Sequence, residues 1–332
     1  MSAAQASAGK VAVLGGGAWA TALAGVAVRA GNEVALWARN ASIVADINAR
    51  HANERYLPGI ALDEDIVATD DLKKTLAGAD IVLMAIPAQT IGEVAASLTP
   101  ILEAGTAVVG CAKGIDRQTA RLPGEIIADA LVGCPVAALS GPSFAADVAR
   151  GLPTAVTIAS RHMEWSTWLA RRLSARTFRC YASDDLKGVE LGGALKNVLA
   201  LAVGIARGLK LGASAEAALV ARGFAELSRL ATALGAQAET LTGLSGLGDL
   251  VLTCSGPQSR NFAYGIALGE ARPLEGLKLA EGVFTASVAL RLAKDNAIDA
   301  PVIEAVTHVL DRSITAGEAV TRLLERPLKT EH

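Results

Sequence analysis

The first half of the chain alternates short apolar runs with segments of helical periodicity. The clearest apolar runs cover residues 11–14, 34–37, 81–86, 107–109 and 136–139. Their near-continuous apolarity is typical of strands in a parallel sheet that is covered on both faces. Between the first two runs, the helical pattern of residues 18–30 ends at Gly31, the usual residue type after a helix C-terminus. Further strands are expected at 155–159 and 178–181.

From about Ser183 the pattern changes to long stretches rich in Ala and Leu, and no further strand is predicted. These stretches cover residues 184–206, 215–234, 286–296 and 303–312. The fold class predicted is therefore an α/β Rossmann domain with a doubly wound, mostly parallel sheet, followed by an all-α domain. The expected limits are 10–185 and 186–330, with residues 1–9 as a flexible leader.

Composition narrows the function classes. The 332 residues are 52% hydrophobic and 19% charged, with a net charge of −2, so a large core is expected and a nucleic-acid partner held by bulk charge is not. The longest apolar run, 198–206, is too short to cross a bilayer, so no membrane insertion is expected. The large apolar second half favours a homodimer.

The cysteines and histidines are scattered. Cys111, Cys134, Cys180 and Cys254 form no pair with metal-ligand spacing, so neither a metal site nor a disulfide framework is predicted. This usage is typical of a reducing compartment and indicates a cytoplasmic protein. None of the histidines lies in a glycine-rich setting, which argues against dehydrogenases that depend on a catalytic histidine.

A glycine-rich loop follows the first predicted strand. Residues 15–20 have the pattern G-x-G-x-x-A between a strand and a helix. Gly15 allows the tight turn, Gly17 lets the backbone approach a pyrophosphate, and Ala20 permits close packing of the helix on the strand. The helix N-terminus adds exposed amides and the positive end of its dipole. The loop therefore predicts dinucleotide binding.

The end of the second strand bears on which cofactor is used. NAD-binding domains usually carry an acidic residue there for the ribose hydroxyls. This chain has Trp37-Ala-Arg-Asn40 instead. Arg39 can face the additional phosphate of NADP, so NADPH is favoured over NADH; a solvated surface arginine is the alternative interpretation.

One lysine stands in an otherwise apolar helical segment. Lys196 is the only cation in residues 188–206, and burial of an unpaired ammonium is unfavourable. Its stem could instead lie along the core with its head in solvent. Gly192 and Gly193, one turn earlier, are expected to leave open space on the same face, and Asn197 adds a hydrogen-bonding group. Because desolvation lowers the pKa of a lysine, Lys196 is interpreted as a proton donor and acceptor.

Further polar clusters accompany this lysine. Asp249 follows a glycine-rich stretch, Thr253 comes one helical turn later, and Arg260 lies between Ser259 and Asn261. An arginine flanked by small polar residues suits a phosphate dianion. In the first half, Lys113 and the segment 140–145 each follow a predicted strand, where open α/β sheets bind ligands.

Together these residues resemble the bacterial type of NAD(P)-dependent glycerol-3-phosphate dehydrogenase. The matching motifs run in family order over most of the chain: 15–24, 112–114, 140–145, 191–197, 246–249 and 259–261. The resemblance implies NAD(P)H-dependent reduction of dihydroxyacetone phosphate to sn-glycerol 3-phosphate, which feeds phospholipid synthesis, with no metal. Two alternatives remain open: a related lysine-dependent hydroxyacid dehydrogenase with an all-α second domain, and a non-catalytic dinucleotide sensor.

The resemblance also implies roles for individual residues. Lys196 is the general acid and base, Lys113 acts with it at the carbonyl, and Asp249 with Thr253 orients the site. The implied substrate contacts are Lys113, Gly141, Ser143, Lys196, Asn197, Asp249, Thr253, Ser259, Arg260 and Asn261. The implied cofactor contacts are Gly15, Gly17, Ala18, Trp19, Arg39, Lys113, Ala145, Arg260, Leu279 and Glu281. The chain departs from the family pattern in two places, at Ala20, where many members have glycine, and in residues 261–281, which are shortened.

Overall fold

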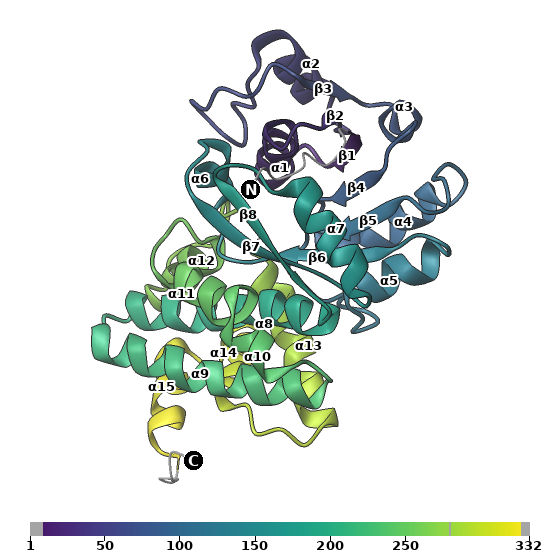
Figure 1. Ribbon diagram of the computed structural model, residues 1–332. Coiled ribbons are helices and arrows are strands. Elements are labelled where there is room, and N and C mark those ends of the chain that lie inside the picture. Colours follow the sequence, from purple (N-terminus) through teal and green to yellow (C-terminus); the bar gives the residue numbers. More distant parts are fainter. Residues whose placement is uncertain (1–8, 279, 327–332) are drawn as a thin grey trace. The chain divides into compact units, whose positions relative to one another are not determined.

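The computed structural model describes residues 9–278 and 280–326, and the chain divides into two compact units (Figure 1). Unit 1 comprises the residues up to Lys113 together with 121–190. Unit 2 comprises residues 114–120 and the chain from Leu191 onward. The division falls inside one long helix, whereas the sequence places the domain limit near residue 185. Residues 1–8 of the predicted leader lie outside the described residues.

Unit 1 is built on an eight-stranded sheet with the order β3-β2-β1-β4-β5-β6-β7-β8. The strands are β1 (Lys10–Leu14), β2 (Glu33–Trp37), β3 (Ile66–Thr69), β4 (Ile81–Met84), β5 (Ala107–Gly110), β6 (Val136–Ser140), β7 (Thr154–Ser160) and β8 (Phe178–Ser183). All neighbours are parallel except β6 and β7. The predicted doubly wound, mostly parallel fold is confirmed.

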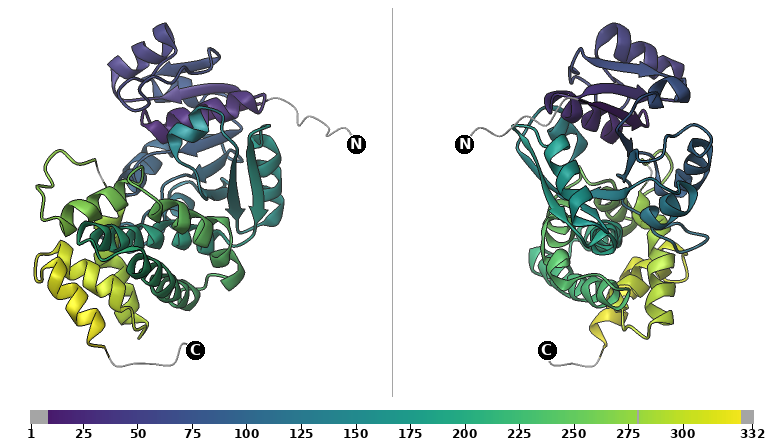
Figure 2. Two further views of the ribbon diagram at one scale, coloured as in Figure 1. Left: turned by 90° about the vertical axis from the view of Figure 1, so that its left-hand side faces the viewer. Right: turned by 45° about the vertical axis from the view of Figure 1, so that its right-hand side comes forward.

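Helices cover both faces of this sheet (Figure 2). Val11 and Val13 of β1 point into one apolar cluster, whereas Ala12 and Leu14 point into the other. The first face carries α1 (Ala18–Arg29), α2 (Ala41–Arg50), α6 (Ala145–Ala149) and α7 (Met163–Leu173). The second face carries α3 (Leu72–Leu76), α4 (Ile91–Leu98) and α5 (Pro123–Ala130). The short helix η1 (Ala88–Thr90) precedes α4. Burial on both faces explains why the strands are apolar without alternation.

One strand, β3, was not predicted from the sequence. Its four residues pair with β2 from Val34↔Ile66 to Trp37↔Thr69. The strand lies at the edge of the sheet, and Val67 is exposed. A short edge strand with one exposed residue lacks the continuous apolar run that marks the central strands. The predicted strand at 81–86 also ends earlier, at Met84.

Among the residues that the structure describes, unit 2 contains helices and connecting segments but no strand, which confirms the all-α prediction. It contains α8 (Leu186–Gly208, whose first residues belong to unit 1), α9 (Ala213–Ala233), α10 (Ala238–Thr242), the π-helix η2 (Leu244–Gly248), α11 (Asp249–Cys254), α12 (Arg260–Gly269), α13 (Glu281–Asp295), α14 (Pro301–Leu310) and α15 (Ala316–Leu324). The shorter helices between α9 and α13, and α15, were not predicted, because each presents fewer than three turns of periodicity.

Helix α8 contains the apolar run 198–206 and is longer than that run. Its 23 residues are long and apolar enough to cross a membrane by length and composition alone. The apolar window is completely buried inside the protein, as expected for a core helix that is apolar all round.

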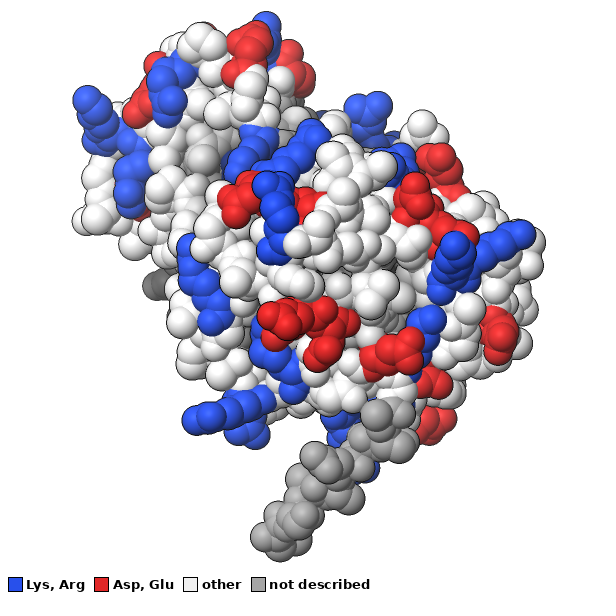
Figure 3. All heavy atoms as spheres, turned by 90° about the horizontal axis from the view of Figure 1, so that it is seen from above, with Lys and Arg blue, Asp and Glu red and all other residues white. Residues whose placement is uncertain are grey.

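Charged side chains of both signs are interspersed over the face of the molecule shown in Figure 3. This distribution agrees with the near-balance of 31 basic and 33 acidic residues. Electrostatic attraction of an anionic ligand must therefore come from a few placed side chains and not from the protein's net charge.

A buried carboxylate, Glu226 of α9, holds the start of α14. It accepts hydrogen bonds from the backbone amides of Val302, at 3.0 Å, and Ile303, at 3.3 Å. The residue is 3% exposed, and burial raises the pKa of this carboxyl to about 7 although both amide contacts lower it. The ionised form is therefore less favourable in the folded protein than in the unfolded chain.

This buried carboxylate should make stability depend on pH. Because the folded pKa lies above the ordinary value of 4.5, the contribution is full below about pH 4.5 and is lost as the pH rises through about 7. Relative to Glu226→Gln, the wild-type protein should lose roughly 3 kcal/mol of unfolding free energy between pH 4.5 and pH 8. Urea denaturation of both proteins at the two pH values measures this; a difference independent of pH would contradict it.

Candidate active site

The glycine-rich loop joins β1 to α1 with the geometry that a bound pyrophosphate requires. Gly15 has a φ of +130°, and a Cβ placed on it would lie 2.6 Å from the Ala85 carbonyl oxygen, so only glycine fits. In contrast, nothing lies within 4 Å of a Cβ placed on Gly17, the N-cap of α1. Among the described residues no side chain caps this helix, which leaves its first amides available to a ligand. The loop therefore fits a dinucleotide.

Arg39 lies beside this loop. Trp37, the last residue of β2, accepts a hydrogen bond from the Gly15 amide at 2.9 Å, and Arg39 follows two residues later with an exposed side chain. Asn40 then caps α2 by accepting from the Ser42 amide. On the other side of the loop, the indole Nε1 of Trp19 is buried and has no hydrogen-bond partner within residues 9–278 and 280–326.

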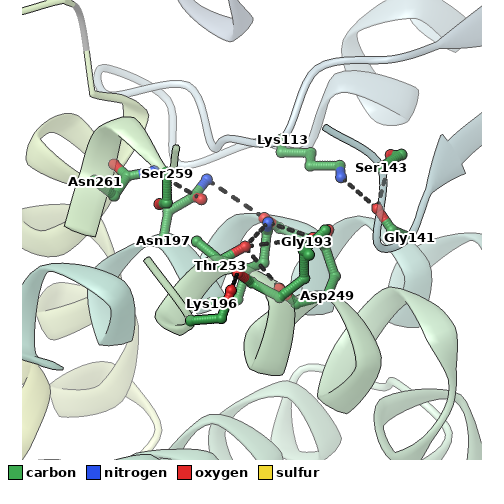
Figure 4. A network of polar contacts seen from close by, with 12 residues as sticks. Lys113, Gly141, Ser143, Gly193, Lys196, Asn197, Asp249, Thr253, Ser259 and Asn261 are labelled. Atoms are coloured by element: carbon green, nitrogen blue, oxygen red, sulfur yellow. Dashed lines mark hydrogen bonds and ion pairs between the residues drawn. The ribbon is translucent and has the colours of Figure 1, made fainter. Parts of the chain in front are cut away.

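Lys113, Gly141 and Ser143 are brought together at the carboxyl ends of β5 and β6 (Figure 4). The Gly141 carbonyl oxygen accepts from Lys113 Nζ at 2.8 Å and from Ser143 Oγ at 2.9 Å. Gly141 has a φ of +145°, and a Cβ there would lie 2.9 Å from Val156 Cα, so the turn depends on glycine. Ala145, another predicted site residue, is the first residue of α6.

In unit 2, Lys196 forms a buried network with Asp249 and Thr253 (Figure 4). Its Nζ donates to Asp249 Oδ1 at 2.6 Å and to Thr253 Oγ1 at 2.5 Å, and the Thr253 hydroxyl donates to the Asp249 carbonyl oxygen at 2.6 Å. The three residues are at most 5% exposed. The lysine head is therefore buried and ion-paired and does not extend into solvent. A carboxylate at this distance offsets part of the cost of desolvating the ammonium.

The expected open space beside Lys196 is filled by backbone. A Cβ placed on Gly192 would lie 2.9 Å from the Ser245 carbonyl oxygen and 3.2 Å from Gly246 Cα. The prediction of an empty face at this glycine was therefore wrong. The missing side chain lets η2 pack against α8, and Asp249 follows directly as the first residue of α11. Gly192 thus brings the carboxylate to the lysine one turn later along α8.

A second polar cluster joins α8, α12 and α13. Asn261 Nδ2 donates to Asn197 Oδ1 at 2.9 Å, and Asn261 Oδ1 accepts from the Gly282 amide at 2.8 Å. Ser259 caps α12 by accepting from the Phe262 amide at 3.2 Å. Arg260 is the exposed first residue of α12, and Glu281 is the half-buried first residue of α13. Leu279 lies outside the described residues.

Glycine pairs in α8 and α12 set this arrangement, and sequence reasoning missed them. A Cβ placed on Gly204 would overlap the Phe262 carbonyl oxygen, and one on Gly265 would overlap the Leu201 carbonyl oxygen. Gly208 and Gly269 meet in the same way one turn further. The signal was present as two glycines four residues apart in each helix. Side chains at these positions would force the two helices apart.

The four cysteines are free thiols. Burial raises the pKa of Cys254, beside Thr253, to about 12, and the pKa of Cys180 also rises to about 12. Thiols of this kind are poor nucleophiles at neutral pH. Within the described part of the chain, no three His, Cys, Asp or Glu side chains are grouped to hold a metal ion.

Comparison with known proteins identifies the family. Residues 10–166 match the family model for the N-terminus of NAD-dependent glycerol-3-phosphate dehydrogenase, and residues 185–321 match the model for its C-terminus. A glycerol-3-phosphate dehydrogenase (NAD(P)+) from Chelativorans sp. is 56% identical over 321 residues, covering 97% of this chain and 98% of the relative. One from Mesorhizobium japonicum is 56% identical over 322 residues, covering 97% and 94%.

A solved structure shows the same architecture. The crystal structure of glycerol-3-phosphate dehydrogenase from Coxiella burnetii superimposes with a TM-score of 0.91 at 41% sequence identity, covering 96% of this chain and 99% of that one. The similarity extends over both units and is not limited to the Rossmann fold, which many unrelated enzymes share.

The close contact of α8 and α12 gives a test of the packing. Gly265→Ala should lower the unfolding free energy by about 1–3 kcal/mol, because the new methyl group meets the Leu201 carbonyl of the facing helix. The matched control is Gly317→Ala in α15, where a Cβ meets nothing within 4 Å; it should stabilise by up to about 1 kcal/mol through helix propensity. Urea denaturation measures both, and equal effects of the two changes would show that the glycine contact is not required.

Proposed function

This chain belongs to the NAD-dependent glycerol-3-phosphate dehydrogenase family, and we propose that it reduces dihydroxyacetone phosphate reversibly to sn-glycerol 3-phosphate with NAD(P)H. The observation that carries this proposal is the buried Lys196–Asp249–Thr253 network. A carbonyl reduction needs a proton at the oxygen, and a lysine ammonium held in one position by two partners can deliver it.

Each member of the network has a distinct task. Lys196 holds the proton at Nζ and gives it to the substrate oxygen as negative charge develops there. Asp249 accepts from Nζ at 2.6 Å and keeps the buried ammonium in place. Thr253 accepts from Nζ and donates to the Asp249 carbonyl, so the lysine head cannot rotate without breaking both contacts. When bound, the nicotinamide cofactor supplies the hydride.

The substrate phosphate and carbonyl require further groups. We assign the phosphate to Arg260 and Asn261, with Asn197 and Ser259 beside them, since Asn261 already holds Asn197 in place. Lys113, Gly141 and Ser143 are further proposed substrate contacts, and Lys113 would add positive charge where negative charge grows. Binding the remote phosphate supplies energy that positions the reacting carbonyl.

The cofactor is assigned to the loop of unit 1 and its surroundings. Gly15, Gly17, Ala18 and Trp19 would hold the pyrophosphate, and the open face of Gly17 supports this. The remaining assigned contacts are Arg39, Lys113, Ala145, Arg260, Leu279 and Glu281. We propose that NADPH is preferred and NADH accepted, because the exposed Arg39 follows β2 where NAD-specific domains carry an acid.

The broader setting is proposed from the same features. Four free cysteines support a reducing, cytoplasmic location. The complete burial of the apolar window of α8 supports a protein that does not insert into a membrane. The apolar second half supports a homodimer, and the product would feed phospholipid synthesis. We retain 10–185 and 186–330 as the limits of the cofactor and catalytic domains.

The role of Lys196 is tested by Lys196→Met, which keeps most of the stem and removes the proton. Turnover of dihydroxyacetone phosphate should fall by at least about a hundredfold, because general acid catalysis is lost, while the Kd for NADPH should change little. The assay follows NADPH absorbance, with calorimetry for the Kd. Near-normal turnover would refute the assignment, and wild-type turnover of carboxylated but not phosphorylated ketones would refute the proposed substrate.

The cofactor preference is tested by Arg39→Asp. The new carboxylate should repel the 2′-phosphate of NADPH and accept from the ribose hydroxyls of NADH. The ratio of kcat/KM for NADPH to that for NADH should therefore fall by more than about tenfold. Exposed Arg55 of the same unit provides a control, and Arg55→Asp should leave the ratio unchanged. A ratio unaffected by Arg39→Asp would show that Arg39 faces solvent.

A further inference from the structure

Asn53 has no assigned role, yet it is fully buried against the glycine-rich loop. It lies in the segment after α2, and its Nδ2 donates to the Gly16 carbonyl oxygen at 3.1 Å and to Thr21 Oγ1 at 2.8 Å. The Thr21 hydroxyl in turn donates to the Gly17 carbonyl oxygen at 3.0 Å. Asn53 therefore holds the Gly16 carbonyl directly, whereas the Gly17 carbonyl is also held by the Thr21 backbone amide, which donates to it at 3.0 Å as the first helical hydrogen bond of α1.

The orientation of these carbonyls determines where the loop amides point. In a trans peptide the C=O and the following N–H point in opposite directions, and the described chain has no cis peptide bond. With the Gly16 carbonyl turned toward Asn53, the Gly17 amide faces away from it. Because the Gly17 carbonyl is turned toward Thr21, the Ala18 amide faces away from Thr21. Gly17 is also where a Cβ would meet nothing within 4 Å.

We propose that Asn53 is a positioning residue for the cofactor pyrophosphate, because it fixes the peptide plane between Gly16 and Gly17, which presents the Gly17 amide. Without this contact the peptide between Gly16 and Gly17 is free to rotate and to turn its carbonyl oxygen toward the phosphates, where it repels an anion. Holding the loop in advance also removes an ordering cost from binding. This inference rests on the proposed cofactor site.

Three variants separate this role from simple packing. Asn53→Ala removes the hydrogen bonds to the Gly16 carbonyl and to Thr21 Oγ1. Thr21→Val removes the hydroxyl that accepts from Asn53 Nδ2 and keeps the side-chain shape. Thr21→Ser keeps the hydroxyl and should preserve its hydrogen bond with Asn53. The matched control is Asn32→Ala: Asn32 is also a buried asparagine of unit 1, and its Nδ2 donates to the carbonyls of Ala27 and Arg172.

The experiment measures the Kd for NADPH by calorimetry, together with the thermal midpoint and the KM for dihydroxyacetone phosphate. Asn53→Ala and Thr21→Val should each raise the Kd by about tenfold, as expected for lost buried hydrogen bonds, with the KM for dihydroxyacetone phosphate nearly unchanged. Thr21→Ser should bind nearly as tightly as the wild type. Asn32→Ala should lower the thermal midpoint without changing the Kd.

The outcomes distinguish the possible failures. A wild-type Kd in Asn53→Ala overturns the inference while the proposed function stands, and so does a Kd raised equally by Asn32→Ala. If Asn53→Ala fails to fold, Thr21→Val and Thr21→Ser decide: equal Kd values for these two overturn the inference, and weaker binding by Thr21→Val alone supports it. A wild-type protein that binds no NADPH refutes the proposed function itself.

Discussion

The ion pair between Lys196 and Asp249 is the interaction on which unit 2 depends. An ammonium buried in an apolar helix is unfavourable unless a carboxylate accompanies it, and removing one partner would leave the other charge buried and unpaired. The fold supplies the carboxylate from the first residue of α11, directly after the π-helix η2, a local geometry often found at functional sites. Gly192 lets that turn approach α8, so a glycine in one helix determines whether a charge in the same helix is compensated.

Close backbone contact recurs along α8. The glycine pairs at 204 and 208, and at 265 and 269, bring α12 against the same helix that carries Lys196. As a result, the N-terminus of α12 presents Arg260 and Asn261 near Asn197. Each substitution that widens this contact is expected to move Arg260 and Asn261, the residues proposed to bind phosphate, relative to Lys196. Helix packing and the proposed phosphate site are therefore expected to be coupled through the spacing of α8 and α12.

Unit 1 uses a different physical solution. Its proposed cofactor site relies on backbone amides at a helix N-terminus, which can bind phosphate without any charged side chain. Such amides are useful only if their peptide planes have the correct orientation. Asn53 provides this at the Gly16 carbonyl, while its other N–H is held by the Thr21 hydroxyl, and Ser143 and Lys113 likewise converge on the Gly141 carbonyl.

The sequence alone determined the fold class and the glycine loop and singled out Lys196 as a candidate, because these depend on local periodicity, on glycine spacing and on the rarity of a charge in an apolar helix. The tertiary structure alone decided what surrounds them. Partners such as Asp249 for Lys196, or Asn53 for Gly16, lie 53 and 37 residues away. The space beside Gly192 was wrongly predicted to be open, and the edge strand β3 was not predicted. In both cases long-range packing leaves no periodic signal in the segment that it contacts.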